Sequence, residues 1–280
     1  MTRVIASLDG TPVTDSITDH AVWAAQRMEA PLRLLHILDR AKYPTTADFS
    51  GHLGLDNREQ LLSELAALDE QRGRLAREQG RRLLEAQQQR AAAAGLEGAE
   101  VLQRHGDVLE TLVEMEEDTR LLVMGKHDEN IGEHIGGRLE TVVRTLRRPI
   151  LVCTPTFQPP RSLMIAFDGS ATTHKGVDRV AGSPLFRALP CHVVMIGSDS
   201  KKNQGQLQWA RDTLEASDFV VTTQLLSGEV EQALCDYRKA HEIDLIVMGA
   251  YGHSAIRRFL VGSTTTCVMR NAKVPVLLLR

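Results

Sequence analysis

The stretch VIASLDGT at residues 4–11 occurs again, in altered form, as LMIAFDGS at residues 163–170. Each copy is an apolar run of strand length that ends in Asp-Gly followed by a hydroxyl residue. Three further pairs keep the same order along the chain: RHGDVLETL (104–112) with LSGEVEQAL (226–234), RLLVMGK (120–126) with DLIVMGA (244–250), and RRPILVC (147–153) with AKVPVLLL (272–279). Self-similarity of this kind indicates a repeated structural unit, so we interpret the chain as a tandem duplication.

The two copies predict two domains of ordinary size. A chain of 280 residues is long enough for two domains that each bury a core. Between the copies, TPTFQPPR (154–161) contains three prolines, which extend neither a strand nor a helix, and we interpret it as a linker. The expected domains are therefore residues 1–153 and 162–280.

The composition argues against several classes of function. The formal net charge is only −3, so no basic field favours nucleic acid or a membrane surface. The longest apolar runs, such as VPVLLL (274–279), are much shorter than a bilayer span, and the first residues do not read as a secretory signal. The four cysteines are dispersed without metal-site spacing, as is typical of reduced thiols. We expect a cytoplasmic protein with no nucleic-acid or membrane partner.

In each half, β-branched apolar runs alternate with helical patterns, which is typical of βαβ units around a parallel sheet covered on both faces. In the second half we expect strands at 162–168, 191–197, 219–225, 243–249 and 274–279 and helices at 171–182, 203–216, 229–242 and 262–271. In the last helix of the first half, four apolar residues share one face and predict a buried stripe: Leu139, Val142, Val143 and Leu146.

The halves differ most at residues 40–98, where the first half carries an insertion. This stretch is rich in Ala, Leu, Glu, Gln and Arg, which are strong helix formers, and the pattern ends at Gly95. We expect a long exposed helix or a helical hairpin. Its charges are most simply a solvated face, and docking of a partner is the alternative.

A glycine-rich loop distinguishes the second half. In an open parallel sheet, ligands bind beyond the carboxyl ends of the strands, where the strand order reverses. Gly249 ends a strand there, and Gly262 and Ser263 open a helix whose free N–H groups and dipole favour an anion. The alternative is that Gly249 and Gly252 are turn residues and Ser263 only caps the helix. The spacing fits neither a P-loop nor a Rossmann motif.

The complete string, Gly249-x2-Gly252-x9-Gly262-Ser263, resembles the nucleotide-binding signature of the universal stress protein (UspA) family, G-x2-G-x9-G-[S/T]. The resemblance covers both halves and includes the aspartates at the ends of the first strands and the prolines before the last ones: Asp9, Asp168, Pro149 and Pro275. It implies an α/β protein of two tandem flavodoxin-like domains (adenine nucleotide alpha hydrolase-like). Each would have a five-stranded parallel sheet of order 3-2-1-4-5 with helices on both faces.

Many members of this family bind ATP, so the resemblance implies ATP accompanied by Mg²⁺ in the second half. Carried over by position, Asp168 would contact the ribose or adenine side, Ile196 would pack on adenine, and the glycine loop would surround the phosphates. The residues implied are Asp168, Ile196, Met248, Gly249, Gly252, His253, Gly262, Ser263 and Thr264. No residue is clearly a protein ligand of Mg²⁺.

The first half departs from the family pattern at this motif. Ten residues separate Gly125 from Gly136, against twelve in the second half, and Gly137 replaces the hydroxyl residue. Glu129 and Glu133 add negative charge where phosphates would lie, which is electrostatically unfavourable. We expect the first half to keep the fold without the phosphate site.

The same loop of the first half holds side chains of metal-binding types: His127, Asp128, Glu129, Glu133 and His134. A zinc site would also need a carboxylate from the first strand end, such as Asp9 or Asp15. A polar, solvated loop is the favoured interpretation, and the sequence does not decide between them.

The family resemblance implies a stress-response binding or signalling module, and the lack of a catalytic motif predicts that it is not an enzyme. No Ser-His-Asp, Cys-His or two-metal carboxylate arrangement is apparent, so any ATP hydrolysis should be slow. In the phosphate loop, His253 is expected to contact phosphate or solvent rather than transfer a proton. Two alternatives stay open: a nucleotide-free interaction scaffold that uses the folds and the insertion, and, more weakly, an ATPase.

The last strand of each half predicts how the halves assemble. The family resemblance implies that single-domain members form dimers through their last strands. In this chain the corresponding segments, PILVC (149–153) and VPVLLL (274–279), are short and apolar and would be sheet edges. We expect the two halves to form an internal pseudo-dimer about a pseudo-twofold axis through these strands. The sequence does not show whether whole chains form a homodimer or which protein is the partner.

Overall fold

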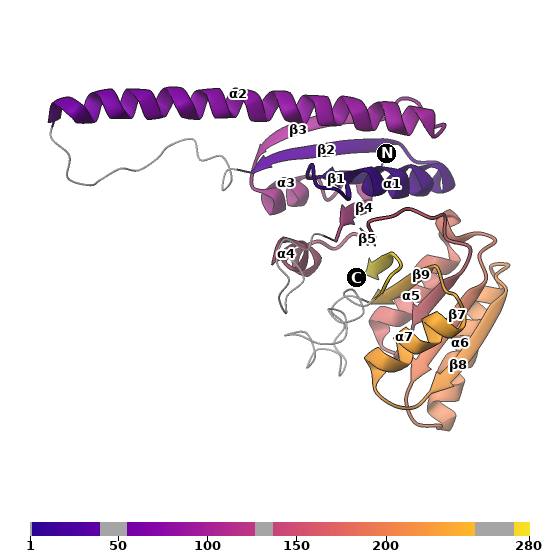
Figure 1. The fold of residues 1–280 in the computed structure, drawn as a ribbon. Coiled ribbons are helices and arrows are strands. Elements are labelled where there is room, and N and C mark those ends of the chain that lie inside the picture. Colours follow the sequence, from indigo (N-terminus) through magenta and orange to yellow (C-terminus); the bar gives the residue numbers. More distant parts are fainter. Residues whose placement is uncertain (1, 40–54, 127–136, 250–271) are drawn as a thin grey trace.

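In the described part of the chain, strands of four to eight residues mostly alternate with helices. The computed structural model describes residues 2–39, 55–126, 137–249 and 272–280 (Figure 1). The first half contains β1 (Arg3–Leu8), α1 (Thr14–Met28), β2 (Leu32–Asp39), α2 (Leu55–Ala93), β3 (Glu100–Gly106), α3 (Val108–Glu114), β4 (Thr119–Gly125), α4 (Gly137–Thr145) and β5 (Ile150–Cys153). The second contains β6 (Leu163–Ala166), α5 (Ala171–Ala181), the 3₁₀ helix η1 (Pro184–Phe186), β7 (Cys191–Ile196), α6 (Lys201–Glu215), β8 (Val221–Leu226), α7 (Val230–Ala240), β9 (Leu245–Gly249) and β10 (Val276–Leu279).

All ten of these strands form one sheet of order β3-β2-β1-β4-β5-β10-β9-β6-β7-β8. Within each half the neighbouring strands are parallel, and the predicted order 3-2-1-4-5 is confirmed in both. The halves meet where β5 and β10 pair antiparallel, with Leu151 opposite Leu277. The prediction that the two halves join through their last strands is therefore confirmed.

Alternate residues of the strands point to opposite faces of this sheet, and both faces are covered by helices. In β1, for example, Val4 and Ala6 belong to one apolar cluster and Ile5 to the other. Helices α1, α2, α5 and α6 pack on the first face, and α3, α4 and α7 on the second. The stripe predicted for α4 is buried in the second cluster, so that prediction is confirmed. Each cluster contains residues of both halves, so the core is continuous across the molecule.

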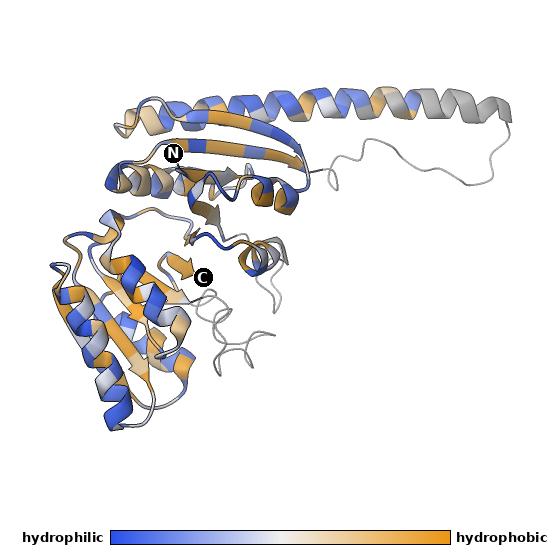
Figure 2. Cartoon of the chain, turned by 180° about the vertical axis from the view of Figure 1, so that it is seen from behind, coloured by the Kyte–Doolittle hydropathy of each residue, from blue (hydrophilic) through white to orange (hydrophobic). Residues whose placement is uncertain are grey.

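Residues 55–93 form a single helix, so a helix rather than a hairpin follows β2. Its C-terminal part packs closely on the sheet: a Cβ added to Gly80 would lie 2.2 Å from Gln103 Nε2 and 2.6 Å from His36 Cδ2. Its N-terminal part extends beyond the sheet (Figure 1), and its described surface is mainly hydrophilic (Figure 2). The segment predicted as an insertion is thus the crossover helix between β2 and β3, lengthened at its N-terminus.

The predicted linker has no helix or strand, but two contacts hold it against α1. Ser16 Oγ donates a hydrogen bond to the Thr154 carbonyl over 2.7 Å. The Phe157 ring packs edge-on against His20, with 4.8 Å between the ring centroids. The connection between the halves is therefore anchored to α1 at these two points, while most of its residues are exposed.

Most element ends in the second half agree with the sequence-based ranges to within two residues. The 3₁₀ helix η1 was not predicted, and the helix predicted at 262–271 lies outside the described residues. None of the helices that the structure describes is both long and apolar enough to span a bilayer.

Candidate functional site

The sheet of the second half has its switch point between β6 and β9, because β6 pairs with β7 on one side and with β9 on the other. Ala166, the last residue of β6, lies in register with Val194 and Met248. The carboxyl ends of these three strands therefore lie side by side. This is the part of an open α/β sheet where ligands usually bind. The predicted residues Asp168, Ile196, Met248 and Gly249 come from these ends.

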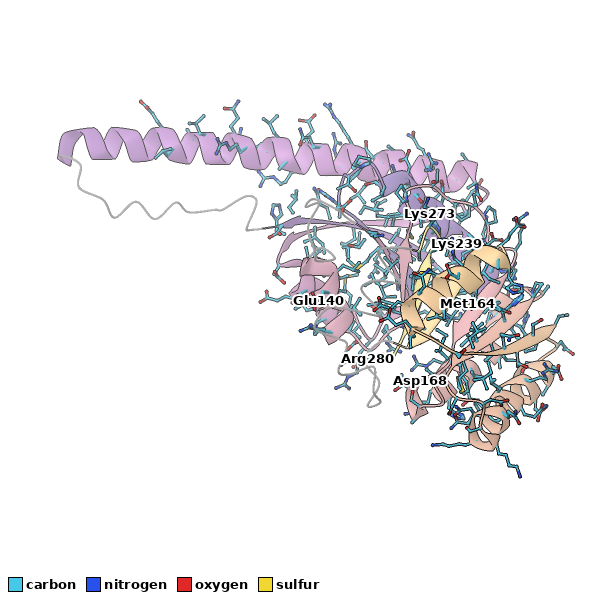
Figure 3. The ribbon with its side chains drawn as sticks, turned by 60° about the horizontal axis from the view of Figure 1, so that its bottom comes forward. Glu140, Met164, Asp168, Lys239, Lys273 and Arg280 are labelled. Atoms are coloured by element: carbon cyan, nitrogen blue, oxygen red, sulfur yellow. The ribbon has the colours of Figure 1, made fainter. Side chains whose placement is uncertain are left out.

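Asp168 lies just beyond β6, in a tight turn that fixes its carboxylate (Figure 3). Its Oδ1 accepts hydrogen bonds from the Ser170 N–H at 2.9 Å and from Thr173 Oγ1 at 2.7 Å. Gly169 has φ +69°, a left-handed conformation that favours glycine, and the turn leads directly into α5. The half-buried carboxylate is thus held in one orientation by the first turn of the helix.

An apolar surface lies beside this carboxylate. Ile196 and Ala166 are half-buried, and both pack against the same apolar cluster that contains Met248, which is 5% exposed. A fixed carboxylate next to a partly open apolar surface suits a ligand with a flat apolar ring and neighbouring hydroxyl donors.

Two amides of α6 hold the turns that follow β6 and β7, and the sequence had not indicated them. Gln206 Nε2 donates to the Gly169 carbonyl at 3.4 Å, and Asn203 Nδ2 donates to the Ser198 carbonyl at 2.9 Å. A Cβ on Gly169 would lie only 1.8 Å from Gln206 Oε1, so the packing is close. The sequence analysis also did not identify Thr173, although its position five residues after Asp168 can be read from the sequence.

The corresponding turn of the first half lacks the bond to the helix. Asp9 Oδ1 accepts from the N–H and the hydroxyl of Thr11, and Gly10 has φ +75°. Thr14, five residues after Asp9 as Thr173 is after Asp168, is 3% exposed, and its Oγ1 has no hydrogen-bond partner among the described residues. The Asp9 carboxylate is exposed and held only by its own turn.

The glycines at the ends of β4 and β9 also differ in their surroundings. A Cβ on Gly125 would lie 2.6 Å from Val13 Cγ2 and 2.9 Å from Ile17 Cδ1. A Cβ on Gly249 would lie 3.3 Å from Thr172 Cγ2, a contact that a small shift relieves. Gly125 is therefore required by its packing against α1, whereas packing alone does not require Gly249.

The described cysteines are free: Cys153 and Cys191 are buried in the protein core, and Cys235 on α7 is partly buried. Burial raises the pKa of the Cys191 thiol to about 12 and raises the pKa of Cys153 well above its usual value. Both thiols are therefore protonated at neutral pH, and neither is a nucleophile there.

Several predicted residues lie outside the described part of the chain. In the second half these are Gly252, His253, Gly262, Ser263 and Thr264, and in the first half they are His127, Asp128, Glu129, Glu133, His134 and Gly136. Among the residues that the structure describes, no group of three or more His, Cys, Asp or Glu side chains could hold a metal ion.

The model of the universal stress protein family matches residues 1–154 and 193–280 of this chain. The chain belongs to the universal stress protein family. It is 31% identical over 287 residues to "Universal stress protein Slr1230" of Synechocystis sp., and the match covers both chains completely. The family resemblance drawn from the glycine motif is confirmed by both findings.

Solved structures of universal stress proteins share the complete architecture. One from Archaeoglobus fulgidus DSM 4304 is similar with a TM-score of 0.69 and 15% identity, covering 99% of this chain and 96% of its own. A putative universal stress protein from Pseudomonas aeruginosa UCBPP-PA14 gives a TM-score of 0.61 and 14% identity, covering 100% and 93%. At these identities the likeness shows a shared fold.

Proposed function

We propose that this universal stress protein binds ATP, accompanied by Mg²⁺, in its second half and acts as a binding or signalling module of the stress response. The observation that carries the proposal is the difference between the two aspartate turns. Asp168 is fixed by Thr173 beside the half-buried Ile196, whereas Asp9 is exposed and Thr14 makes no bond to it. Of these two described aspartate turns, the one at Asp168 is bonded to the following helix, and we assign the ligand to it.

In this proposal the base and the sugar occupy the described part of the site. Adenine packs on Ile196 and Ala166, and a ribose hydroxyl donates to Asp168, which is already oriented by its own turn. An oriented acceptor binds with little loss of side-chain entropy. Met248 and Gly249 end the neighbouring strand and form the far side of the site.

The phosphates are assigned on the sequence alone. The glycine motif from Gly249 to Ser263 would supply backbone N–H groups, and Ser263 and Thr264 would supply hydroxyl donors, with His253 in the same loop. Bound Mg²⁺ would neutralise part of the phosphate charge, and no residue of the chain is assigned as its ligand.

We assign no catalytic residue, because neither the motif nor the described turn offers a group that positions an attacking water. Hydrolysis of bound ATP should therefore be slow. Steady-state release of phosphate from ATP and Mg²⁺ measures this, and sustained turnover that a substitution in the site abolishes would favour the ATPase alternative.

Matched substitutions of the two aspartates test the proposal. Asp168→Asn and Asp9→Asn each keep an Oδ1 acceptor for the turn, remove the negative charge and replace the other carboxylate oxygen by an NH2 donor. Loss of a charge-assisted hydrogen bond weakens binding by about tenfold or more. Isothermal titration calorimetry should show this loss of ATP affinity for Asp168→Asn and none for Asp9→Asn. Equal effects of the two substitutions, or wild-type protein that does not bind ATP, would contradict the proposal.

The scaffold alternative is favoured by one observation, the helix α2. Its N-terminal part extends beyond the sheet, and Leu68 and Leu75 are 50% and 52% exposed. A protein partner that covers these leucines would explain their exposure. Mass spectrometry of the small molecules released from purified, denatured protein distinguishes the two functions, because only the ATP-binding protein should release an adenine nucleotide.

A further inference from the structure

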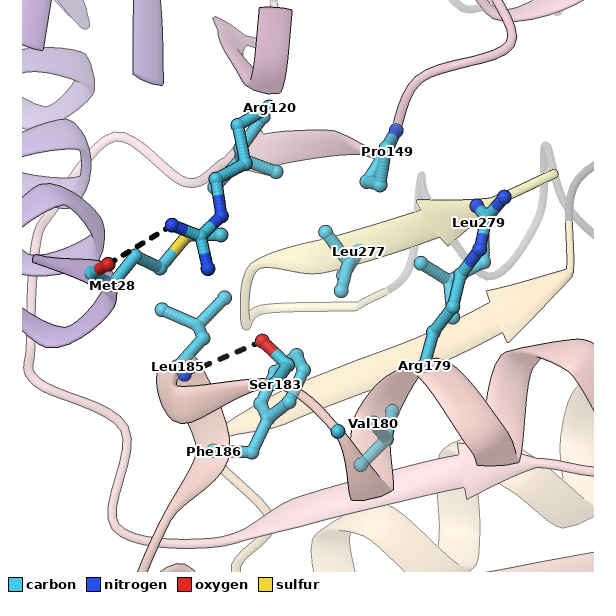
Figure 4. Close-up of a pocket in the computed structure, with 12 residues that line it drawn as sticks. Met28, Arg120, Pro149, Arg179, Val180, Ser183, Leu185, Phe186, Leu277 and Leu279 are labelled. Atoms are coloured by element: carbon cyan, nitrogen blue, oxygen red, sulfur yellow. Dashed lines mark hydrogen bonds between the residues drawn. The ribbon is translucent and has the colours of Figure 1, made fainter. Parts of the chain in front are cut away.

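A cavity of about 290 Å³ lies between the two halves (Figure 4). Its walls come from the end of α1 and the start of β4 in the first half, and from α5, η1 and β10 in the second. Its apolar lining residues belong to the cluster on the α1 and α5 face of the sheet: Met28, Leu121, Val180, Leu185, Phe186, Leu277 and Leu279. Ile196 and Met248 belong to the opposite face, so this cavity is separate from the proposed nucleotide site.

Two arginines, one from each half, stand on either side of this apolar cavity. Arg120 points into it from β4, and its Nη1 donates to the Met28 carbonyl at 3.1 Å (Figure 4). Arg179 stands on α5 on the other side, near Pro149 and Leu279 (Figure 4). A cavity with apolar walls and a few convergent polar groups is the usual form of a small-molecule site, and this volume is near the lower end of the range of roughly 300–1,000 Å³.

The charge beside the cavity is positive. A second hollow of about 530 Å³ shares Pro149 and Arg179 with it and adds Arg147, Arg148, Glu116 and Glu117. The Arg148 guanidinium donates to the carbonyls of Glu116 and Glu117, and the Glu116 carboxylate accepts the N–H of Arg147. Among the residues that the structure describes, no ion pair joins a carboxylate to any of the four arginines around the two hollows. The residues that line the two hollows thus include four arginines and two glutamates.

We propose that this interdomain cavity binds a small amphipathic anion, a medium-chain carboxylate whose apolar chain fills the cavity and whose head group lies between Arg120 and Arg179. Burial of methylene groups against the leucines favours the chain. Guanidinium groups match a carboxylate geometrically and by charge, which favours the head group. Because both halves supply walls and one arginine each, the ligand stabilises the contact between them.

Titration of the full chain with octanoate, measured by isothermal titration calorimetry, tests this proposal. Octanol has the same chain without the charge, and we expect it to bind at least tenfold more weakly. Arg179→Gln should weaken octanoate binding by about tenfold, and Arg120→Gln should do the same. Arg187→Gln is the matched control, because Arg187 is exposed beside η1 and does not line the cavity. Saturating ATP should leave the affinity for octanoate unchanged.

Three results would overturn the proposal: no binding of octanoate, equal affinities for octanoate and octanol, or an affinity that neither arginine substitution changes. Competition between ATP and octanoate would overturn the placement of the ligand in this cavity. Arg179 is exposed, so Arg179→Gln should fold normally. If Arg120→Gln fails to fold because it loses the bond to Met28, the Arg179 variant and the octanol comparison still decide the question.

Discussion

Single residues distinguish the aspartate turns of the two halves. Thr173 holds the Asp168 carboxylate, whereas the equivalent Thr14 is buried without a partner among the described residues. A buried hydroxyl without a hydrogen bond costs stability, so Thr14 lacks the contribution that Thr173 makes in the second half. The glycines at the ends of β4 and β9 also differ. Gly125 is required by its packing against α1, whereas Gly249 lies at the candidate site.

We predict that Gly125→Ala destabilises the protein and that Gly249→Ala does so much less. The added methyl group at 125 would overlap Val13 and Ile17, and such overpacking costs about 1–3 kcal/mol. At 249 the nearest atom is 3.3 Å away and needs only a small shift. Urea unfolding of both variants measures the difference. Equal losses in the free energy of unfolding would show that the packing difference is not real.

His20 predicts how stability depends on pH. The side chain is fully buried, its Nδ1 lies 2.7 Å from the Ser16 carbonyl, and burial lowers its pKa below the usual 6.5 more than Ser16 and Asp19 raise it. Because folding disfavours the charged form, the stabilisation is complete above about pH 6.5 and is lost as the pH falls below it, at up to about 1.4 kcal/mol per pH unit.

The variant His20→Gln cannot take up this proton. The difference in the free energy of unfolding between the wild type and His20→Gln should therefore shrink as the pH falls from 7 to 5, in urea unfolding at a series of pH values. The other histidines are common to both proteins and cancel in the comparison. A difference that stays constant or grows over this range would contradict the assignment.

At the scale of elements, α2 is one helix in two environments. Its C-terminal part packs on β2 and β3 through Gly80, while nothing lies within 4 Å of a Cβ added to Gly73. The sequence could not separate a single helix from a hairpin, because Ala, Leu, Glu, Gln and Arg continue through the segment without a clear break. In the structure α2 packs on the sheet where Gly80 contacts His36 and Gln103. These two residues are remote from Gly80 in sequence.

The two glycines of α2 give a matched prediction. Gly73→Ala should stabilise the protein by about 0.5–1 kcal/mol, because alanine is the better helix former and the site is open. Gly80→Ala should destabilise it, because the methyl group would displace the His36 ring, whose Nδ1 lies 2.9 Å from the Leu8 carbonyl. Thermal unfolding followed by circular dichroism measures both changes. Stabilisation by both substitutions would mean that Gly80 is not a packing contact.

At the scale of the whole molecule, the sheet and both apolar clusters run through the two halves without interruption. Side chains also cross the junction: Arg280 donates to the carbonyls of Arg144 and Leu146, and Arg27 donates to that of Leu185. The tandem repeat predicted two similar halves, and the family resemblance predicted the strand order and the junction through the last strands. The antiparallel pairing of β5 with β10 follows from the two unpaired edges.

The candidate site was only partly readable from the sequence. The Asp-Gly turns and strand ends are local patterns, so Asp168, Ile196 and Gly249 could be placed in advance. Gln206 could not, because it reaches Gly169 only after α6 packs beside α5. The cavity between Arg120 and Arg179 has no sequence signal at all, since its walls meet only through the pairing of the two halves.

We propose that the two halves share a fold and that only the second binds ATP. The number of ATP molecules bound per chain, measured by isothermal titration calorimetry on the wild-type protein with Mg²⁺, tests this proposal. We expect one ATP per chain. Two equivalent sites per chain would show that the exposed Asp9 turn and the shorter acidic loop of the first half still bind nucleotide, and no binding would contradict the assignment to the second half.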